Sequence, residues 1–340
     1  MRIVLDAMGS DTHPEPELRA AIEAFQRWND PIFLTGPEEL LNAKLSTMNV
    51  ERDAVHVIHA PEVLGMEDKP AQSAKGKAKS SMAIGIQMLK DGQADAFVTA
   101  GNTGGVMANA LLRLGRIRGL RRPALATVFP VRGGHAIIID LGANADCRPI
   151  NLLQFAILGS EYAKLIFQKQ NPRVALVSNG EEAGKGNRLV SETFPEMEAL
   201  DLNFIGNIEP KELFAGVADV AVTDGFTGNI LIKTTEAAAR FLFEIIRSEI
   251  KSTVITSLGG LLARPAFKRI NARLDPAVYG AAPLLGVKGL VFVGHGRSGS
   301  NALVNAIRVA RDAVKGNLLE ALVVSLQNQL SFSNNMEEVH

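Results

Sequence analysis

Two short loops of the chain have the composition of an anion-binding site. Both are rich in glycine and asparagine and precede a helical pattern: residues 101–105 read Gly-Asn-Thr-Gly-Gly, and residues 224–229 read Asp-Gly-Phe-Thr-Gly-Asn. Backbone N–H groups of such a loop, together with the first turn of the helix that follows, bind anions such as phosphate. Turn formation alone would explain the glycines of either loop. The presence of two such loops favours a phosphate site.

Two further loops add basic side chains. Lys185 lies between Gly184 and Gly186, which allow the backbone to approach a ligand while the ammonium group neutralises it. His295 and Arg297 follow another apolar run and are candidates for contact with the same anion. A lone lysine in a loop is more often a solvated surface residue, and a lone histidine more often caps or packs. Residue type by itself does not decide between these roles and anion binding.

Each of these loops follows a short apolar run that is typical of a β-strand. Six such runs precede polar loops: residues 2–5, 94–100, 136–140, 173–177, 219–223 and 290–293. Because helical patterns alternate with them, the sequence predicts an α/β fold with a mostly parallel sheet. Ligands bind beyond the carboxyl ends of parallel strands, so we expect the six loops at or near one edge of the molecule.

The segment 229–274 interrupts this alternation. Its first half carries apolar residues at helical spacing, namely Phe241, Leu242, Ile245, Ile246 and Ile250. A short apolar stretch and a basic helical pattern follow. We expect a helical hairpin with an apolar tip that projects from the sheet. Residues 1–330 are predicted to form a single two-lobed α/β domain that includes this hairpin, and residues 331–340 a flexible tail.

Composition limits the class of protein. Of the 340 residues, 46% are hydrophobic and 5% aromatic, which is typical of an aliphatic core under a helix-covered sheet. Lys plus Arg equals Asp plus Glu at 36 each, so no overall positive charge favours nucleic acid. A single cysteine excludes an intramolecular disulfide, and neither a secretory leader nor a membrane span is evident. We therefore expect a cytoplasmic protein.

Other catalytic patterns are incomplete. Gly294, Gly296 and Gly299 match a dinucleotide fingerprint, but the acid some twenty residues later, Glu320, falls in a helical pattern. An NAD-dependent dehydrogenase therefore has weak support. The sequence places no Cys or acidic partners at metal-ligand spacing from its histidines, so no metal is expected. Cys147 is interpreted as a small packed hydrophobe rather than a nucleophile. We expect no cofactor.

The order of the loops closely resembles that of the acyl-acyl-carrier-protein:phosphate acyltransferases, the PlsX family. The resemblance runs from residue 6 to about residue 310. It rests on the segments D-A-M-G-S-D (6–11), A-G-N-T-G-G (100–105), D-L-G-A-N-A-D-C-R-P (140–149), G-E-E and K-G-N (180–187), D-G-F-T-G-N (224–229), A-P-L-L-G-V-K-G (282–289) and H-G-R-S (295–298). Ser10 and Ala281 stand where glycine is usual, and the segment between Glu182 and Lys185 is shorter than usual.

The resemblance implies an enzyme that makes acyl phosphate from inorganic phosphate and acyl-[acyl-carrier-protein], feeding phospholipid synthesis. It also implies a three-layer αβα sandwich similar to isocitrate and isopropylmalate dehydrogenases and to phosphotransacetylases. A phosphotransacetylase that acts on acyl-coenzyme A is the nearest alternative. A non-catalytic membrane adaptor is disfavoured, because it would have no use for six polar loops.

Such a reaction requires neither a strong base nor a metal, because a thiolate leaves easily and phosphate is nucleophilic near neutral pH. The enzyme must position the dianion and stabilise the developing oxyanion. The predicted catalytic residues are Lys185, Asn229, His295 and Asn102. The predicted phosphate ligands are Gly101, Asn102, Thr103, Gly104, Lys185, Gly228 and Asn229. Asp6 and Asp224 are predicted to orient the loops.

Two surfaces are predicted to bind partners. Acyl carrier protein is acidic, and five arginines follow the first phosphate loop: Arg113, Arg116, Arg118, Arg121 and Arg122. They are interpreted as its docking site, with a solvated helix face as the alternative. The hairpin tip is interpreted as a peripheral contact with the inner face of the cell membrane, through Leu258, Leu261 and Leu262. The resemblance implies the same association and a homodimer joined through these helices; packing in that interface is the alternative for the tip.

Overall fold

A computed structural model describes residues 1–337 except 49, 51–53 and 275–277. In this part of the chain, eleven strands form one sheet in the order β3-β2-β1-β4-β11-β10-β5-β6-β9-β7-β8. The strands are β1 (Ile3–Asp6), β2 (Ile32–Gly36), β3 (Val55–His59), β4 (Ala96–Thr99), β5 (Ala124–Val131), β6 (Gly134–Ile139), β7 (Val174–Val177), β8 (Phe204–Ile208), β9 (Val220–Val222), β10 (Ala282–Leu285) and β11 (Val291–Val293).

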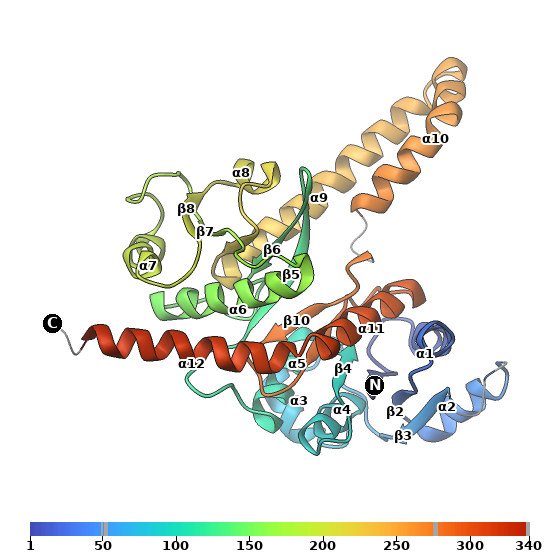
Figure 1. The fold of residues 1–340 in the computed structure, drawn as a ribbon. Helices are drawn as coiled ribbons and strands as arrows, with labels where there is room; N and C mark the ends of the chain where they lie inside the picture. Colours follow the sequence, from blue (N-terminus) through green and yellow to red (C-terminus); the bar gives the residue numbers. More distant parts are fainter. Residues whose placement is uncertain (49, 51–53, 275–277, 338–340) are drawn as a thin grey trace.

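Helices cover both faces of this sheet, and one pair of helices extends away from it (Figure 1). They are α1 (Glu15–Trp28), α2 (Glu38–Leu45), α3 (Pro70–Gly76), α4 (Ser81–Lys90), α5 (Thr103–Arg113), α6 (Pro149–Phe167), α7 (Arg188–Glu198), α8 (Pro210–Ala215), α9 (Gly225–Ile250), α10 (Val254–Leu274), α11 (Ser300–Lys315) and α12 (Leu318–Glu337).

The three layers follow from strands that are apolar on both faces. In β1, Ile3 and Leu5 belong to one hydrophobic core, whereas Val4 lies in a second core on the opposite face. In β6, Ile139 likewise faces the first core and Ile138 a third. Successive side chains of a strand point to opposite faces, so both faces need a helical cover. The predicted αβα sandwich is thus confirmed.

The strands form two parallel groups joined by an antiparallel centre. Strands β1 to β4 and β11 are parallel to one another, and so are β6, β7, β8 and β9. Between them, β10 is antiparallel to β11 and β5, and β5 is antiparallel to β6. The two groups therefore run in opposite directions within the sheet. Because this centre reverses the strand direction, the carboxyl ends of the two groups do not lie along one edge of the sheet.

The projecting helical hairpin is confirmed as the pair α9 and α10 (Figure 1). Its far half exposes large apolar side chains, including Phe241, Leu242, Val254 and Ile255. None of the helices in the described residues is long and apolar enough to cross a membrane. Helix α12 continues to Glu337 and so covers most of the predicted tail, while residues 338–340 lie outside the described residues. The division into one domain and a tail stays a prediction.

Candidate active site

A cavity of about 500 Å³ lies where the two strand groups meet. Three predicted residues from distant parts of the chain line it: Thr103 at the start of α5, Asn229 near the start of α9, and His295 after β11. Neighbouring strands twist by about 20–25°, so four steps from β4 to β6 rotate the sheet by roughly 80–100°. This rotation explains how loops of opposed strand groups contribute to one cavity.

The other walls of the cavity are largely apolar. They include Leu125, Val128 and Phe129 of β5, Ile232 of α9, and Phe214 of α8. The cavity therefore combines a polar end, made by loops and helix N-termini, with an apolar wall. Such a cavity fits a ligand that has a charged head and a hydrocarbon part.

The first predicted phosphate loop is held in place by a buried carboxylate. One oxygen of Asp6 accepts a hydrogen bond from Thr99 Oγ1 at 2.8 Å, and the other accepts one from the Met8 N–H at 3.1 Å. Thr99 Oγ1 in turn accepts a hydrogen bond from the Gly101 N–H at 2.9 Å. Burial raises the pKa of Asp6, and its hydrogen bonds oppose that shift. This chain of contacts supports the predicted role of Asp6.

The side chain of Asn102 is used within the protein. Its Oδ1 accepts a hydrogen bond from the Gly105 N–H at 2.9 Å and so caps α5, while its Nδ2 donates to the Met66 carbonyl at 2.8 Å. Both ends of the amide thus stabilise the loop. Gly104 packs closely, since an added Cβ would lie 2.6 Å from a Pro70 side-chain carbon. Thr103, whose side chain is exposed beside the cavity, is the better-placed donor of this loop.

The second loop is built on two further carboxylates. Asp224 caps α9, because its two oxygens accept hydrogen bonds from the Thr227 N–H at 2.9 Å and the Thr227 hydroxyl at 2.8 Å. The buried Asp140 accepts hydrogen bonds from the N–H groups of Leu125 and Asn144. A Cβ at Gly228 would overlap the Asp140 carbonyl oxygen, so only glycine fits there. Asp140 was not singled out from the sequence, although it begins one of the motifs.

A lysine that the sequence did not single out lines the cavity. Lys233 lies one turn beyond Asn229 on α9, and its Nζ is 3.9 Å from a carboxylate oxygen of Glu236. The guanidinium of Arg297 lies 3.8 Å from the same oxygen. The i, i+4 spacing from Asn229 was a signal for Lys233, because residues four apart share one helix face.

His295 is a neutral side chain near pH 7. Burial lowers its pKa below the usual 6.5; the carboxylate of Glu236 opposes this shift, while Arg297 and Lys233 add to it. Neutral imidazole carries one N–H donor and one acceptor nitrogen. His295 is therefore available for a hydrogen bond to a bound anion, and it gains a proton more easily once that anion is present.

Lys185 lies elsewhere. Its side chain is exposed in the loop between β7 and α7, and Lys185 is not among the described residues that line the cavity. Asn207 Nδ2 supports this loop by donating to the Glu182 carbonyl at 2.9 Å. Gly186 and Asn187 line a second cavity of about 610 Å³ on the same strand group. The structure thus brings Lys233, not Lys185, together with Asn229 and His295.

The predicted arginine surface divides in two. Arg113 is half-buried, and its guanidinium donates to Asn109 Oδ1 at 3.3 Å and to Gln87 Oε1 at 3.4 Å. Burial lowers its pKa. The remaining four, Arg116, Arg118, Arg121 and Arg122, are exposed.

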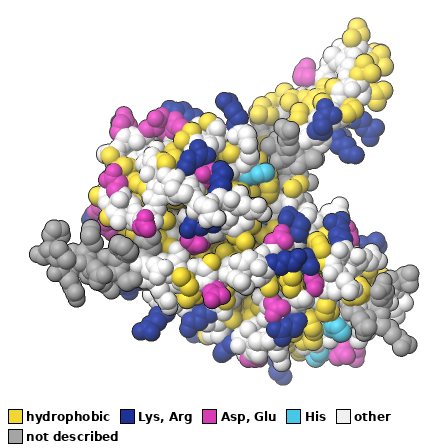
Figure 2. All heavy atoms as spheres, in the orientation of Figure 1, with side chains coloured by type: hydrophobic (Ala, Val, Ile, Leu, Met, Phe, Trp, Pro, Cys, Tyr) yellow, Lys and Arg dark blue, Asp and Glu magenta, His cyan; other side chains and the backbone are white. Residues whose placement is uncertain are grey.

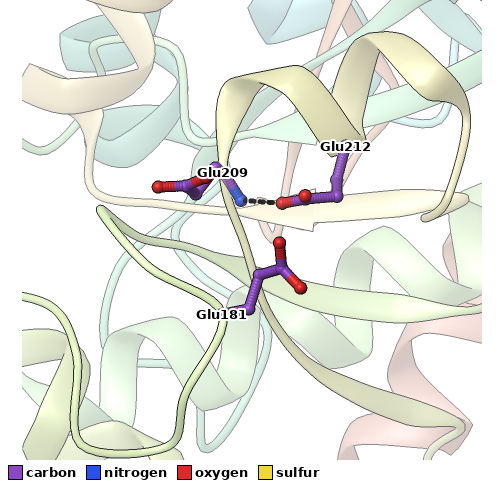
Figure 3. A group of neighbouring side chains, drawn as sticks. All are labelled: Glu181, Glu209 and Glu212. Atoms are coloured by element: carbon purple, nitrogen blue, oxygen red, sulfur yellow. Dashed lines mark hydrogen bonds between the residues drawn. The ribbon is translucent and has the colours of Figure 1, made fainter.

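Two other groups of reactive side chains have structural explanations. Glu181, Glu209 and Glu212 lie close together (Figure 3). The Lys211 ammonium is 2.6 Å from Glu209 and 3.2 Å from Glu181. One lysine thus pairs with all three carboxylates of this cluster. Cys147 packs against the first core, and burial, with help from nearby carboxylates, raises its pKa to about 12. A thiol with this pKa is a poor nucleophile near pH 7.

Comparison with known proteins identifies the family. A family model described as "Fatty acid synthesis protein" matches residues 1–321. The phosphate acyltransferase of Halothermothrix orenii is 44% identical over 322 residues, which cover 94% of this chain and 96% of that protein. The chain belongs to the phosphate acyltransferase family. The family member of Dictyoglomus turgidum is 46% identical over 317 residues, covering 93% and 94% of the two chains.

Solved structures with the same fold are more distant in sequence from this phosphate acyltransferase family member. A phosphotransacetylase from Streptococcus pyogenes matches with a TM-score of 0.57 and 18% identity, over 96% of this chain and 94% of that one. The 4-hydroxythreonine-4-phosphate dehydrogenase from Klebsiella pneumoniae matches with a TM-score of 0.52 and 14% identity, over 92% and 99%. These likenesses confirm the predicted dehydrogenase- and phosphotransacetylase-like fold.

Proposed function

We propose that the chain is an acyltransferase that forms acyl phosphate from inorganic phosphate and an acyl thioester of acyl carrier protein. The observation that supports this proposal most directly is the cavity where the two strand groups meet. Its polar end carries Thr103, Asn229, Lys233 and His295, and the wall opposite is apolar. Its polar end suits a phosphate dianion, and its wall suits the acyl chain. Membership of the phosphate acyltransferase family supports the same reaction.

In this mechanism, the phosphate is bound by the loop around Thr103 and by the Asn229 amide, with Lys233 supplying a positive charge. One phosphate oxygen attacks the thioester carbonyl carbon, and a tetrahedral oxyanion forms. Collapse of this intermediate breaks the C–S bond, so acyl phosphate and the carrier thiolate leave. Hydrogen-bond donors aimed at the oxyanion are each typically worth about 3 kcal/mol. In this proposal, Asn229 and His295 supply them.

The other predicted ligands have more distant roles. Gly101, Gly104 and Gly228 allow the loops to pack closely, and Asn102, Asp6 and Asp224 hold them in position. Lys185 is proposed to act from its neighbouring loop on the thioester carrier or on phosphate as it enters. In this arrangement Lys233 is the cation in the cavity, and Lys185 is the cation near its entrance.

The protein substrate is proposed to dock on the exposed arginines after α5. Acyl carrier protein is acidic, and the four exposed guanidinium groups provide complementary charge. Charge reversal at Arg116 and Arg118 is expected to raise KM for the carrier substrate at least several-fold, with little change in KM for phosphate. An unchanged KM for the carrier substrate would exclude this surface.

The hairpin is proposed to make two contacts. Its tip exposes Leu258, Leu261 and Leu262, and Figure 2 shows apolar side chains gathered at the end of the hairpin with basic side chains nearer the body. Such a surface favours peripheral binding to an anionic membrane from the cytoplasmic side. The apolar stripe of α9, including Phe241 and Ile245, is proposed to join two chains in a homodimer.

One assay tests the proposed reaction against its rivals. The protein is incubated with phosphate and either acyl-[acyl-carrier-protein] or acyl-coenzyme A, and acyl phosphate is trapped as hydroxamate. We expect product with the carrier protein, at a higher kcat/KM than with coenzyme A. A preference for coenzyme A would indicate a phosphotransacetylase. Nicotinamide reduction without hydroxamate would indicate a dehydrogenase and overturn the proposal.

A further inference from the structure

The two cavities share a boundary on either side of α9. Of the described residues, Phe214 and Thr235 line both the 500 Å³ cavity and the 610 Å³ cavity. Asn229 and Lys233 face the first cavity, whereas Ile230 and Thr234 face the second, so α9 passes between them. Helix α9 therefore separates the two spaces, and they come together at Phe214 and Thr235.

The backbone around Phe214 is held on both sides. The Phe214 carbonyl accepts a hydrogen bond from the Arg132 N–H at 2.9 Å, which ties α8 to the end of β5. Gly216, at a φ of +77°, ends α8 where an added Cβ would lie 2.7 Å from the Arg132 carbonyl oxygen. Because the backbone is fixed, the position of the boundary depends on the Phe214 side chain.

The Phe214 ring is partly exposed. It is 42% exposed, although it stacks edge to face with the buried Phe129 at a centroid distance of 5.3 Å. The hydroxyl of Thr235, the other boundary residue, donates to the Leu231 carbonyl at 2.8 Å and is therefore satisfied within the helix. The boundary thus presents little unsatisfied polar surface to a hydrocarbon chain.

The second cavity has both apolar and polar lining residues. Its lining includes Val177, Val190, Pro210, Ile230 and Leu231. Its polar lining residues are partly engaged, since Asn187 caps α7 and Asp224 caps α9. A hydrocarbon chain that entered from the first cavity would find apolar contact beyond Phe214.

We propose that Phe214 sets the acyl-chain length that this enzyme prefers, because its ring lies between the first cavity and the second. Only acyl chains long enough to pass the ring reach the second cavity. This inference rests on the proposed acyl transfer and adds a specificity-determining residue and a distal acyl site to it. The distal part of a saturated hydrocarbon chain would contact the apolar residues of the second cavity. Replacing Phe214 by a smaller side chain would join the two cavities. Replacing it by a larger side chain would shorten the space for the acyl chain in the first cavity.

The test compares acyl-[acyl-carrier-protein] substrates with a graded series of chain lengths. For each protein, kcat/KM for acyl phosphate formation is measured across the series. Each additional buried CH₂ changes kcat/KM by about fourfold. Phe214→Ala is therefore expected to move the optimum to longer chains by at least two carbons, and Phe214→Trp to reduce kcat/KM for the longest chains about tenfold or more.

Phe204→Ala is the matched control. Phe204 makes a similar edge-to-face pair with Phe194, at a centroid distance of 5.2 Å, and the substitution removes this pair. Phe204 belongs to the same strand group but lines neither cavity. The control is expected to keep the wild-type optimum. If both Phe214 variants kept that optimum while turning over acyl substrates, the inference would be wrong. If the wild-type protein made no acyl phosphate from any thioester, the proposed function would fail instead.

Discussion

Replacing Lys233 is the sharpest test of how phosphate is bound. Lys233 lines the cavity with Asn229 and His295, whereas Lys185 lies in a loop beside the second cavity. We expect Lys233→Met, which keeps much of the side-chain length but removes the charge, to weaken phosphate binding in the transition state. Lys185→Met makes the same chemical change in the other loop.

The magnitude follows from the type of contact. A hydrogen bond to a charged group contributes about 1.5–3 kcal/mol, or roughly 10- to 150-fold in kcat/KM for phosphate. Lys233 has a side chain 63% exposed and a distant ion pair with Glu236, so the lower half of this range is expected. Its effect should also decrease with added salt, because exposed charges are screened.

The assay varies phosphate at saturating acyl carrier substrate and traps the product as hydroxamate. Lys90→Met, at an exposed lysine that lines neither cavity, controls for the loss of one surface charge. Lys233→Met should raise KM for phosphate by more than Lys185→Met does. If Lys233→Met stayed within twofold of the wild type while Lys185→Met lost activity, the cavity assignment of the phosphate would be refuted.

Three further outcomes are expected. Because burial lowers the pKa of His295 below 6.5, the part of the acid limb of kcat/KM that His295 causes should lie below that pH and be lost in His295→Gln, while the part caused by protonation of phosphate stays; an unchanged profile below pH 6.5 would assign the limb to another group. Gly228→Ala should abolish most activity because its Cβ overlaps the Asp140 carbonyl, whereas Gly259→Ala, with open space around it, should be neutral or more stable by about 0.5–1 kcal/mol in thermal unfolding. The double variant Leu258→Glu, Leu261→Glu should abolish flotation with anionic liposomes without changing turnover of soluble substrate. If flotation were retained, the hairpin tip would be assigned to a protein interface rather than to membrane binding.

Local features were predictable from the sequence because they depend on neighbouring residues. A strand at residues 2–5 and helices after the loops 101–105 and 224–229 were expected, and all three elements are present. Their bounds differ, because β1 includes Asp6, and α5 and α9 begin at Thr103 and Gly225, inside the predicted loops. Asn and Asp before a helix form caps through contacts only three residues away, as Asn102 and Asp224 do. The apolar stripe at Phe241 and Ile245 likewise predicted the hairpin from helical spacing alone.

The assembly of the site was decided only by tertiary structure. The antiparallel strands β5 and β10 reverse one strand group against the other, and nothing in the local pattern of either strand reveals this pairing. Their position and the twist of the sheet determine which loops meet. The sequence favoured Lys185, because it lies between two glycines, but in the structure Lys233 of α9, and not Lys185, lines the cavity with His295. Contacts between residues far apart in the chain depend on this packing, so residue type and local spacing favoured the wrong lysine for this cavity.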